Sequence, residues 1–298
     1  MKKIYGVIYS MISAALFGLQ PVLAKIAYNN GMNTTTLLFL RFFLGAIMIF
    51  TYMNVKHIDF KINKKQGNYL IFLGIVGYGL TAFLLFLAYH YISVGLATIL
   101  HFVYPIFVTI LAFILYKEKL KMNKILALVL SGFGIYFLVG DGYLHLNMKG
   151  VILALISGIS YAVYMVGLAN KLFEDLNNYV MTFYLSLVAA IFLIVLGFVN
   201  NSIVLHMNKI GMSIAISIAF ISSVIAPMLL LEGIRIIGPS NAAILSTFEP
   251  IVGTILGIIV LHECFTIKIA MGSALILVSV VMVTMANRNE QKKVECEK

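Results

Sequence analysis

The chain alternates between long apolar runs and short polar links over nearly its whole length. The hydrocarbon core of a bilayer is about 30 Å thick, and a helix needs about 20 largely apolar residues to cross it. Runs of this length recur along the chain and predict ten transmembrane helices. The predicted runs are residues 4–28, 33–54, 67–90, 94–116, 123–139, 149–170, 179–199, 210–231, 238–261 and 266–286.

The polar links between these runs are short, and the longest of them is Lys56–Gln66. Other links fall at residues 29–31, 141–147, 174–178 and 200–208. None is long enough to form a soluble domain, so the predicted fold consists of its membrane spans.

Basic residues gather on one side of the predicted bilayer. With both termini in the cytoplasm, sixteen of the 21 Lys and Arg residues lie on the cytoplasmic side and four lie outside. The sixteen are Lys2, Lys3, Lys56, Lys61, Lys64, Lys65, Lys117, Lys119, Lys121, Lys124, Lys171, Arg235, Arg288, Lys292, Lys293 and Lys298; the four are Lys25, Lys149, Lys209 and Lys268. Because cytoplasmic loops are enriched in Lys and Arg, this bias predicts a multi-pass plasma-membrane protein with both termini cytoplasmic.

The composition agrees with an integral membrane protein. Hydrophobic residues make up 62% of the chain and charged residues 11%, with a mean hydropathy of +1.03, whereas about a quarter of the residues of a soluble domain are charged. Cytoplasmic lysines explain the net charge of +10, so no nucleic-acid partner is predicted. Cys264 and Cys296 fit neither a disulfide framework nor a metal cluster, and no metal or cofactor is predicted. The first run lacks a convincing signal-peptide cleavage pattern and is interpreted as the first helix.

An internal repeat appears when the chain is compared with itself at an offset of 145 residues. Residues 92–119 and 237–264 then share eleven identities in 28 positions, with Pro105 aligned on Pro250. Many transporters are built from such repeats.

Each repeat is predicted to hold five helices, and this odd number makes the second half enter the membrane from the opposite face. We therefore predict an all-α integral membrane fold with ten transmembrane helices, arranged as two inverted five-helix repeats around a central cavity. The predicted parts are residues 1–145 for the first repeat, 146–287 for the second, and 288–298 for a cytoplasmic polar tail.

Short motifs stand at related places in the two halves. They are Phe17-Gly18 and Lys25 in the first run, Arg41-Phe42 in the second, Tyr104-Pro105 followed by Glu118, Glu249-Pro250 followed by Glu263, and the glycines Gly132, Gly134 and Gly272. Together they resemble the drug/metabolite transporter superfamily, specifically its ten-helix EamA-type branch, over the whole chain. That family usually has Trp-Gly where this chain has Phe17-Gly18, and this chain contains no Trp. Aromatic surfaces must therefore come from its 16 Tyr and 21 Phe residues.

The resemblance implies a carrier driven by protons or another gradient, commonly an exporter of amino acids or other small metabolites. It also implies a central cavity lined by the first, third, fourth, sixth, eighth and ninth helices.

Glu249 is the most informative single residue, because it is an ionisable group near the middle of a predicted span. A charge at bilayer depth costs roughly 3 kcal/mol or more and usually faces a cavity or a partner. One interpretation is a reversible proton or cation site. The other is a protonated carboxyl that caps the backbone exposed by Pro250. Repeat symmetry places Tyr104 opposite Glu249.

Pro105 and Pro250 are predicted to kink their helices. Each removes a main-chain N–H donor, which frees the carbonyl of His101 and of Ser246, respectively. Such kinks are either packing features or discontinuities that face a ligand. Because the two kinks match across the repeat and a polar side chain stands at each freed carbonyl, we favour the cavity-facing interpretation. His101 is either a core histidine with satisfied hydrogen bonds or a cavity residue.

Further polar groups at depth are Gln20, Tyr78, Thr81, Tyr161 and Tyr164. A spacing of three residues places Tyr78 and Thr81 on one helix face, and it does the same for Tyr161 and Tyr164. Each group alone fits a hydrogen bond between helices, whereas as a converging set they predict a binding site, whose rings would also suit an organic cation. The predicted substrate-binding set is Gln20, Tyr78, Thr81, His101, Tyr104, Tyr161, Tyr164, Ser246 and Glu249.

Arg41 and Lys25 lie toward the outer ends of the second and first predicted helices, where long side chains can reach the interface. We favour membrane anchoring for both, and the alternative for each is a contact with the carboxylate of a substrate. On the anchoring interpretation the charges do not require an anionic substrate.

The predicted function is secondary active transport of a small metabolite, an amino acid or related amine, by alternating access, with export as the direction and proton coupling through Glu249. The expected partners are the small-molecule substrate and the lipid bilayer, and the oligomeric state is left open. The alternatives are a membrane-embedded enzyme, for which no catalytic motif is found in the sequence, and a channel, which would need a continuous polar stripe or a charged ring.

Overall fold

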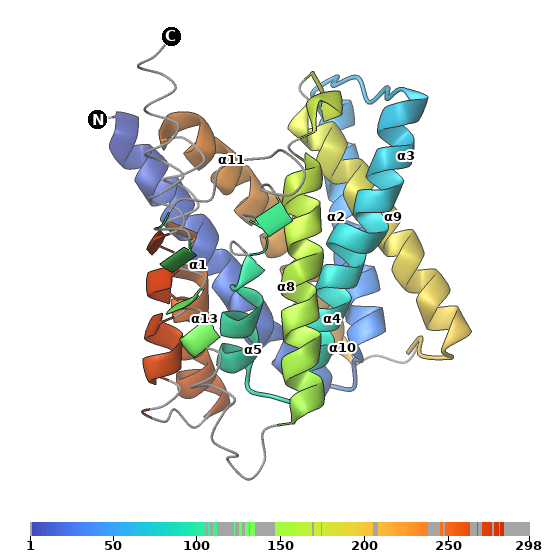
Figure 1. Cartoon of the computed structure of the whole chain (residues 1–298). Coiled ribbons are helices and arrows are strands. Elements are labelled where there is room, and N and C mark those ends of the chain that lie inside the picture. The colour runs from blue at the N-terminus through green and yellow to red at the C-terminus, as the bar shows by residue number, and fades with distance from the viewer. Residues whose placement is uncertain are drawn as a thin grey trace.

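A computed structural model describes residues 2–104, 147–168, 170–173, 175–204, 208–237, 245–246 and 248–262, with scattered positions between 107 and 134 and between 267 and 282. Every regular element among these residues is helical, and the helices form a bundle (Figure 1). In chain order the elements are α1 (Lys2–Asn29), α2 (Thr34–Val55), α3 (Lys64–Phe72), η1 (Leu73–Gly79), α4 (Leu80–Ala88), α5 (Val94–His101), α8 (Met148–Leu168), η2 (Lys171–Phe173), α9 (Asn178–Val199), α10 (Lys209–Phe220), η3 (Ile221–Ile225), α11 (Ala226–Ile237) and α13 (Phe248–Leu261).

Six helical stretches in the described part of the chain are long and apolar enough to cross a membrane. They are Ile4–Asn29, Thr34–Val55, Lys64–Ala88, Met148–Leu168, Asn178–Val199 and Lys209–Leu230. These stretches confirm six of the predicted runs to within a few residues. The other four runs include residues outside the described part, and α5 and α13 lie in two of them.

Asparagine side chains fix where several helices begin. Asn33 accepts a hydrogen bond from the Thr36 amide before α2, and Asn208 accepts one from the Gly211 amide before α10. Asn63 and Gln66 form a reciprocal capping box before α3. These caps satisfy amides that the first helical turn leaves unpaired, so the short polar links end the spans sharply.

Hydrogen bonds between links place them at two ends of the bundle. At one end, the Asn208 side-chain amide donates to the side chain of Asn30 over 3.0 Å. At the other end, the Gln66 side-chain amide donates to the Leu172 carbonyl over 2.9 Å. The span that starts with α3 and the span that starts with α10 therefore begin at opposite ends of the bundle.

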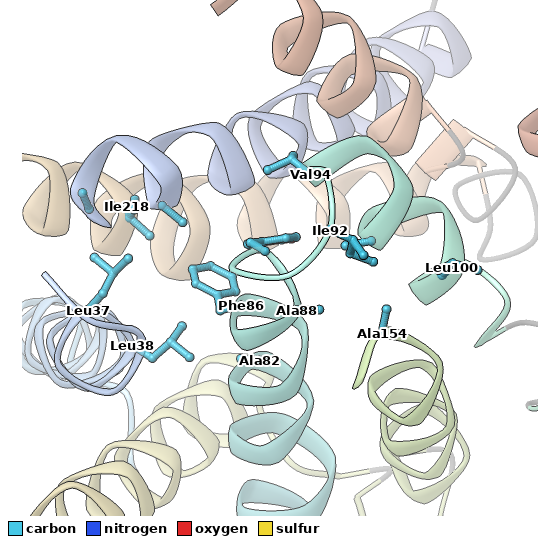
Figure 2. Close-up of a cluster of buried hydrophobic side chains, with 14 of the residues drawn as sticks. Leu37, Leu38, Ala82, Phe86, Ala88, Ile92, Val94, Leu100, Ala154 and Ile218 are labelled. Carbon is cyan, nitrogen blue, oxygen red and sulfur yellow. The ribbon is translucent and has the colours of Figure 1, made fainter. Parts of the chain in front are cut away.

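The core is a continuous apolar cluster that joins both parts of the chain. Figure 2 shows Leu37 and Leu38 of α2, Phe86 of α4 and Ile218 of α10 meeting in it. Contacts between helices come in matching pairs: α1 packs on α11 and α13, while α8 packs on α4 and α5, and α2 packs on α9. α8 lies beside both α4 and α5 (Figure 1). Residues of α8 can therefore contact residues of the first half.

Two of the six spans contain a π-helical segment, η1 in one and η3 in the other. After each segment the amide reaches the fifth residue back, from Leu80 to the Ile75 carbonyl and from Ala226 to the Ile221 carbonyl. Pro227 lies two residues after the end of η3 and lacks the amide that an α-helix would need there. Such segments are frequent at functional sites.

Candidate functional site

A cluster of aromatic rings joins the first half of the chain to α8 in the second half. The ring of Tyr161 in α8 meets the Tyr104 ring edge-on at a centroid distance of 4.7 Å. Tyr161 and Tyr164 stack at 5.5 Å, and Tyr164 stacks on Tyr78 of η1 at 5.5 Å. All four tyrosines are half-buried. The structure thus brings together four of the predicted site residues.

His101, the last residue of α5, belongs to the same cluster. Its ring lies 5.4 Å from the Tyr161 ring and 5.8 Å from the Tyr104 ring. Its Nδ1 atom lies 2.9 Å from the Ser157 hydroxyl oxygen, and that hydroxyl donates to the Ala154 carbonyl. Because a hydroxyl has one hydrogen to donate, Nδ1–H donates to Ser157 and Nε2 is left as an acceptor. Ser157, which the sequence did not single out, therefore orients this imidazole.

Two glycines allow the close packing that builds the cluster. A Cβ atom at Gly158 of α8 would lie 2.8 Å from the His101 carbonyl oxygen. A Cβ atom at Gly77 of η1 would lie 2.6 Å from the Cβ atom of Tyr164. Only glycine permits both approaches, so α8 fits tightly against the end of α5 and against η1.

Glu249 comes from the second half and interacts electrostatically with tyrosines of this cluster. It lies in α13 and is half-buried. Its carboxylate interacts electrostatically with the hydroxyls of Tyr104 and Tyr161 and with the guanidinium of Arg41.

The interpretation of Arg41 as an outer membrane anchor is wrong. Its side chain is only 5% exposed. The guanidinium carbon lies 4.7 Å from the centre of the Phe42 ring and 5.9 Å from that of Phe86, and Tyr78 is close enough to interact electrostatically with the guanidinium. The anchoring rule fails because α2 packs on α9, α10 and α4, so a long side chain on this helix can be enclosed by protein. Its signal in the sequence was a lone arginine inside an apolar run.

The remaining predicted residues are less closely tied to the cluster. Gln20 of α1 and Thr81 of α4 are buried, and the Thr81 hydroxyl has no hydrogen-bond partner. Ser246 is half-buried. Pro105 lies outside the described residues, and Pro250 is described only as part of the α13 backbone. Within the described part of the chain, no three His, Cys, Asp or Glu side chains are placed to hold a metal ion.

A second polar cluster closes one end of the bundle. The rings of Tyr28 and His90 stack at 4.2 Å, and His90 Nε2 lies 2.9 Å from the Thr34 hydroxyl oxygen. That hydroxyl donates to the Tyr28 oxygen, so Nε2–H donates to Thr34. His90 is exposed as a residue, and partial desolvation of its imidazole, followed by the positive charge of Lys25, lowers its pKa. His90 is therefore neutral at pH 7 and joins the ends of α1, α2 and α4.

Comparisons with known proteins add a family to this geometry. The sequence profile of the EamA-like transporter family matches the chain over residues 4–140 and again over residues 148–285. A protein from Clostridium kluyveri described as an uncharacterized transporter is 24% identical over 99% of this chain and 97% of its own length. Another from Archaeoglobus fulgidus, with the same description, is 27% identical over 93% of this chain and 96% of its own. The uncharacterized transporter YoaV of Bacillus subtilis is 25% identical over 82% of this chain and 85% of its own.

A solved structure shows the same fold. A crystal structure of another protein superposes with a TM-score of 0.68, covering 95% of this chain and 98% of that one at 14% sequence identity.

Proposed function

We propose that this chain, which belongs to the EamA-like transporter family and is a multi-pass membrane protein, is a secondary active transporter of a small metabolite. The class we favour is an amino acid or a related amine, with export across the plasma membrane as the direction. The observation that carries this proposal is Glu249, a carboxylate that interacts electrostatically with tyrosines of the aromatic cluster inside the bundle. A carboxylate beside aromatic faces attracts an ammonium group by charge and by cation–π interaction.

Alternating access is the mechanism that we propose, with ten helices in two inverted five-helix repeats of residues 1–145 and 146–287 and both termini in the cytoplasm. The double match of the family profile supports two repeats. The paired helix contacts, and the start of α3 and α10 at opposite ends of the bundle, support their inversion. In such folds one repeat rocks against the other around a site near the bilayer midplane.

Glu249 is also the proposed coupling residue, which would bind a proton when the substrate amine leaves. The competing role is a protonated carboxyl that caps the backbone at Pro250. A membrane-embedded enzyme and a channel are the other functions considered, and the transporter descriptions of the relatives favour a carrier over both.

Transport by the purified protein in liposomes tests this function. Liposomes loaded with single amino acids or amines are diluted into the labelled solute, and exchange across the membrane is measured between pH 5.5 and 8.5. We expect saturable exchange of at least one solute, and we expect Glu249→Gln to lose the pH dependence of the rate. Asp175→Asn, which removes an exposed carboxyl in a link, is the matched control and should behave as wild type.

Single-channel currents, together with a flux that does not saturate with solute concentration, would contradict the proposal that the protein is a carrier. Unchanged pH dependence in Glu249→Gln would remove the coupling role and leave the capping role.

A further inference from the structure

The link between α2 and α3, together with the first residues of α3, concentrates positive charge at one end of the bundle (Figure 1). Residues 56–65, called the basic link below, contain four lysines, and Asp59 is their only acidic residue. All four lysines are exposed, and Lys61 pairs with Asp59 at 3.6 Å. The other three, which have no carboxylate within 4.0 Å in the described part of the chain, are Lys56, Lys64 and Lys65.

The way in which α2 ends fixes the start of the basic link. The Ile58 amide donates to the Met53 carbonyl over 2.9 Å, and the His57 amide donates to the Asn54 carbonyl over 3.2 Å. His57 has a φ of 51°, the left-handed conformation that this type of helix ending requires. The side chains of Met53 and Ile58 then pack in one apolar cluster. The chain therefore leaves α2 in a defined direction.

The rest of the basic link is attached to the second half of the chain. The Tyr184 hydroxyl of α9 donates to the Phe60 carbonyl over 3.0 Å, and Ile62 packs against the small apolar clusters beneath the link. The bond from Gln66 to the Leu172 carbonyl holds the start of α3 in the same way. Because the backbone under the lysines is fixed, binding a ligand here orders little more than their side chains.

An exposed apolar stripe on α2 leads to the basic link. Phe43, Ile47 and Phe50 are exposed, and spacings of four and three residues place them on one helix face. The Phe60 ring is also exposed and lies 5.9 Å from the Phe50 ring, so the stripe continues past the end of α2. In a bilayer such a stripe contacts acyl chains, and lysines just beyond the end of a span lie at the depth of the headgroups.

We propose that the basic link and this stripe form a binding site for an anionic phospholipid, whose phosphate meets the lysines while an acyl chain lies along Phe50 and Phe60. Charge complementarity selects the headgroup, because clusters of four or more basic residues directly beside a membrane span attract anionic lipids. The exposed rings favour a lipid over a soluble anion, which would leave their apolar surface uncovered. This site lies apart from the aromatic cluster, and it does not depend on the proposed transport function.

The opposite end of the bundle provides a comparison. There the Asn30 and Asn208 side chains bond to each other, and the lysines are spread over three separate helices instead of one link. These lysines are Lys25 of α1, Lys149 of α8 and Lys209 of α10. The two ends thus offer the same number of cations without a carboxylate nearby, but only the basic link gathers them beside exposed rings.

Lipid binding to the purified, detergent-solubilised protein tests the proposal. Native mass spectrometry measures the affinity for phosphatidylglycerol, which is anionic, and for phosphatidylcholine with the same acyl chains, which is zwitterionic. We expect wild type to bind phosphatidylglycerol about tenfold more tightly. Raising the ammonium acetate concentration should reduce this preference, because salt screens exposed charges.

A triple variant assigns the preference to the basic link. Lys56→Gln/Lys64→Gln/Lys65→Gln should reduce it to less than about twofold. The matched control replaces the three lysines of the opposite end by glutamine and so has the same net charge, and it should keep the wild-type preference. Phe60→Ser should weaken both lipids about threefold and leave the preference unchanged, because it removes only a contact with the acyl chain.

Equal affinity of wild type for the two lipids overturns the proposal, and this comparison stands even if a variant fails to fold. An equal loss of preference in the two triple variants also overturns it, because net charge alone would then be the cause. Displacement of the lipid by millimolar inorganic phosphate would assign the site to a free anion instead. Unchanged affinities in Phe60→Ser would refute the position of the acyl chain.

Discussion

In the first half of the chain, the positions at or beside the aromatic cluster carry a cation and large rings, whereas the positions 145 residues later carry a carboxylate and small hydroxyls. His101 and Tyr104 correspond in this way to Ser246 and Glu249 within the aligned stretch, and Ser186 and Ser223 stand 145 residues after Arg41 and Tyr78. The buried hydroxyls of Ser186 and Ser223 have no hydrogen-bond partner. Two halves with related backbones thus supply unlike side chains, and this difference avoids placing two like charges opposite each other at low dielectric.

Copying a residue from one half into the other tests how much this difference matters. The largest effect is expected from Glu249→Tyr, which gives the second half the residue found at position 104. Exchange of an amino acid or amine in liposomes should fall about 100-fold, because the ammonium loses its charged partner. Tyr104→Phe, which keeps the ring, is the control and should stay within a few fold of wild type. A Glu249→Tyr protein that exchanges at the wild-type rate would show that the carboxylate is dispensable.

A smaller loss is expected from Tyr78→Ser, which copies Ser223 into the first half. The change removes the ring stacked on Tyr164 and the hydroxyl that interacts electrostatically with Arg41. Solute affinity, measured by titration of the purified protein, should weaken about tenfold. Tyr78→Phe should lose less, and Ser223→Ala should bind as wild type because its hydroxyl has no partner to lose. If Ser223→Ala and Tyr78→Ser weaken binding equally, the two halves contribute alike and the comparison fails.

Gly77→Ser copies Ser222 into η1 and should affect stability more than affinity. The new Cβ atom would lie 2.6 Å from that of Tyr164, and such overpacking costs about 1–3 kcal/mol. Thermal unfolding of the solubilised protein should show the loss as a lower midpoint. Gly132→Ser, where an added Cβ meets no atom within 4 Å, should leave the midpoint unchanged. Equal midpoints for both variants would mean that α8 can move away from η1 freely.

The smallest effect is expected from His90→Arg, which copies Arg235 into the first half. The pKa of His90 is lowered in the folded protein, so the unfolded chain takes up a proton first as the pH falls. Stability linked to His90 is therefore present above about pH 6.5 and is lost as the pH falls from there toward the lowered pKa. The unfolding midpoint of wild type should drop between pH 7 and pH 5.

An arginine at position 90 is charged throughout this range, so the variant should begin lower and show a flatter pH profile. Lys25→Gln should reduce the slope without removing it, because partial desolvation is the larger cause of the lowered pKa. A slope that is the same in all three proteins would exclude His90 as its source.

Much of the fold could be predicted because hydrophobicity and turn chemistry act locally. Six described spans match the predicted runs, and asparagines such as Asn33 and Asn63 mark where helices begin. The spacing of three between Tyr161 and Tyr164 correctly indicated one face, and their rings stack. The π-helical segments η1 and η3 could not be predicted from the sequence, because each apolar run continues through its π segment without a change in pattern. The assumed α-helical spacing between Tyr78 and Thr81 does not hold, since η1 ends between these residues.

The candidate site was only partly predictable, because burial depends on which helices surround a residue. Arg41 lies seven residues after the start of α2. At that depth an arginine on a lipid-facing helix side can act as a membrane anchor, whereas an arginine on a protein-facing side becomes a buried cation. Ser157 gave no signal, because a serine in an apolar run is ordinary until a histidine from another helix reaches it. The role of Gln20 stays a prediction.

The π segments also change how this chain must be aligned with its relatives. A turn closed by a hydrogen bond to the fifth residue back holds one residue more than an α-turn, so the side chains beyond it are rotated by about 100° relative to an uninterrupted helix. Within Lys64–Ala88, the stripe of residues that starts at exposed Ile71 does not continue straight into α4. A homologue that lacks this extra residue would need a one-position gap inside a transmembrane helix. Without the gap, every residue on one side of η1 would be matched to the wrong face.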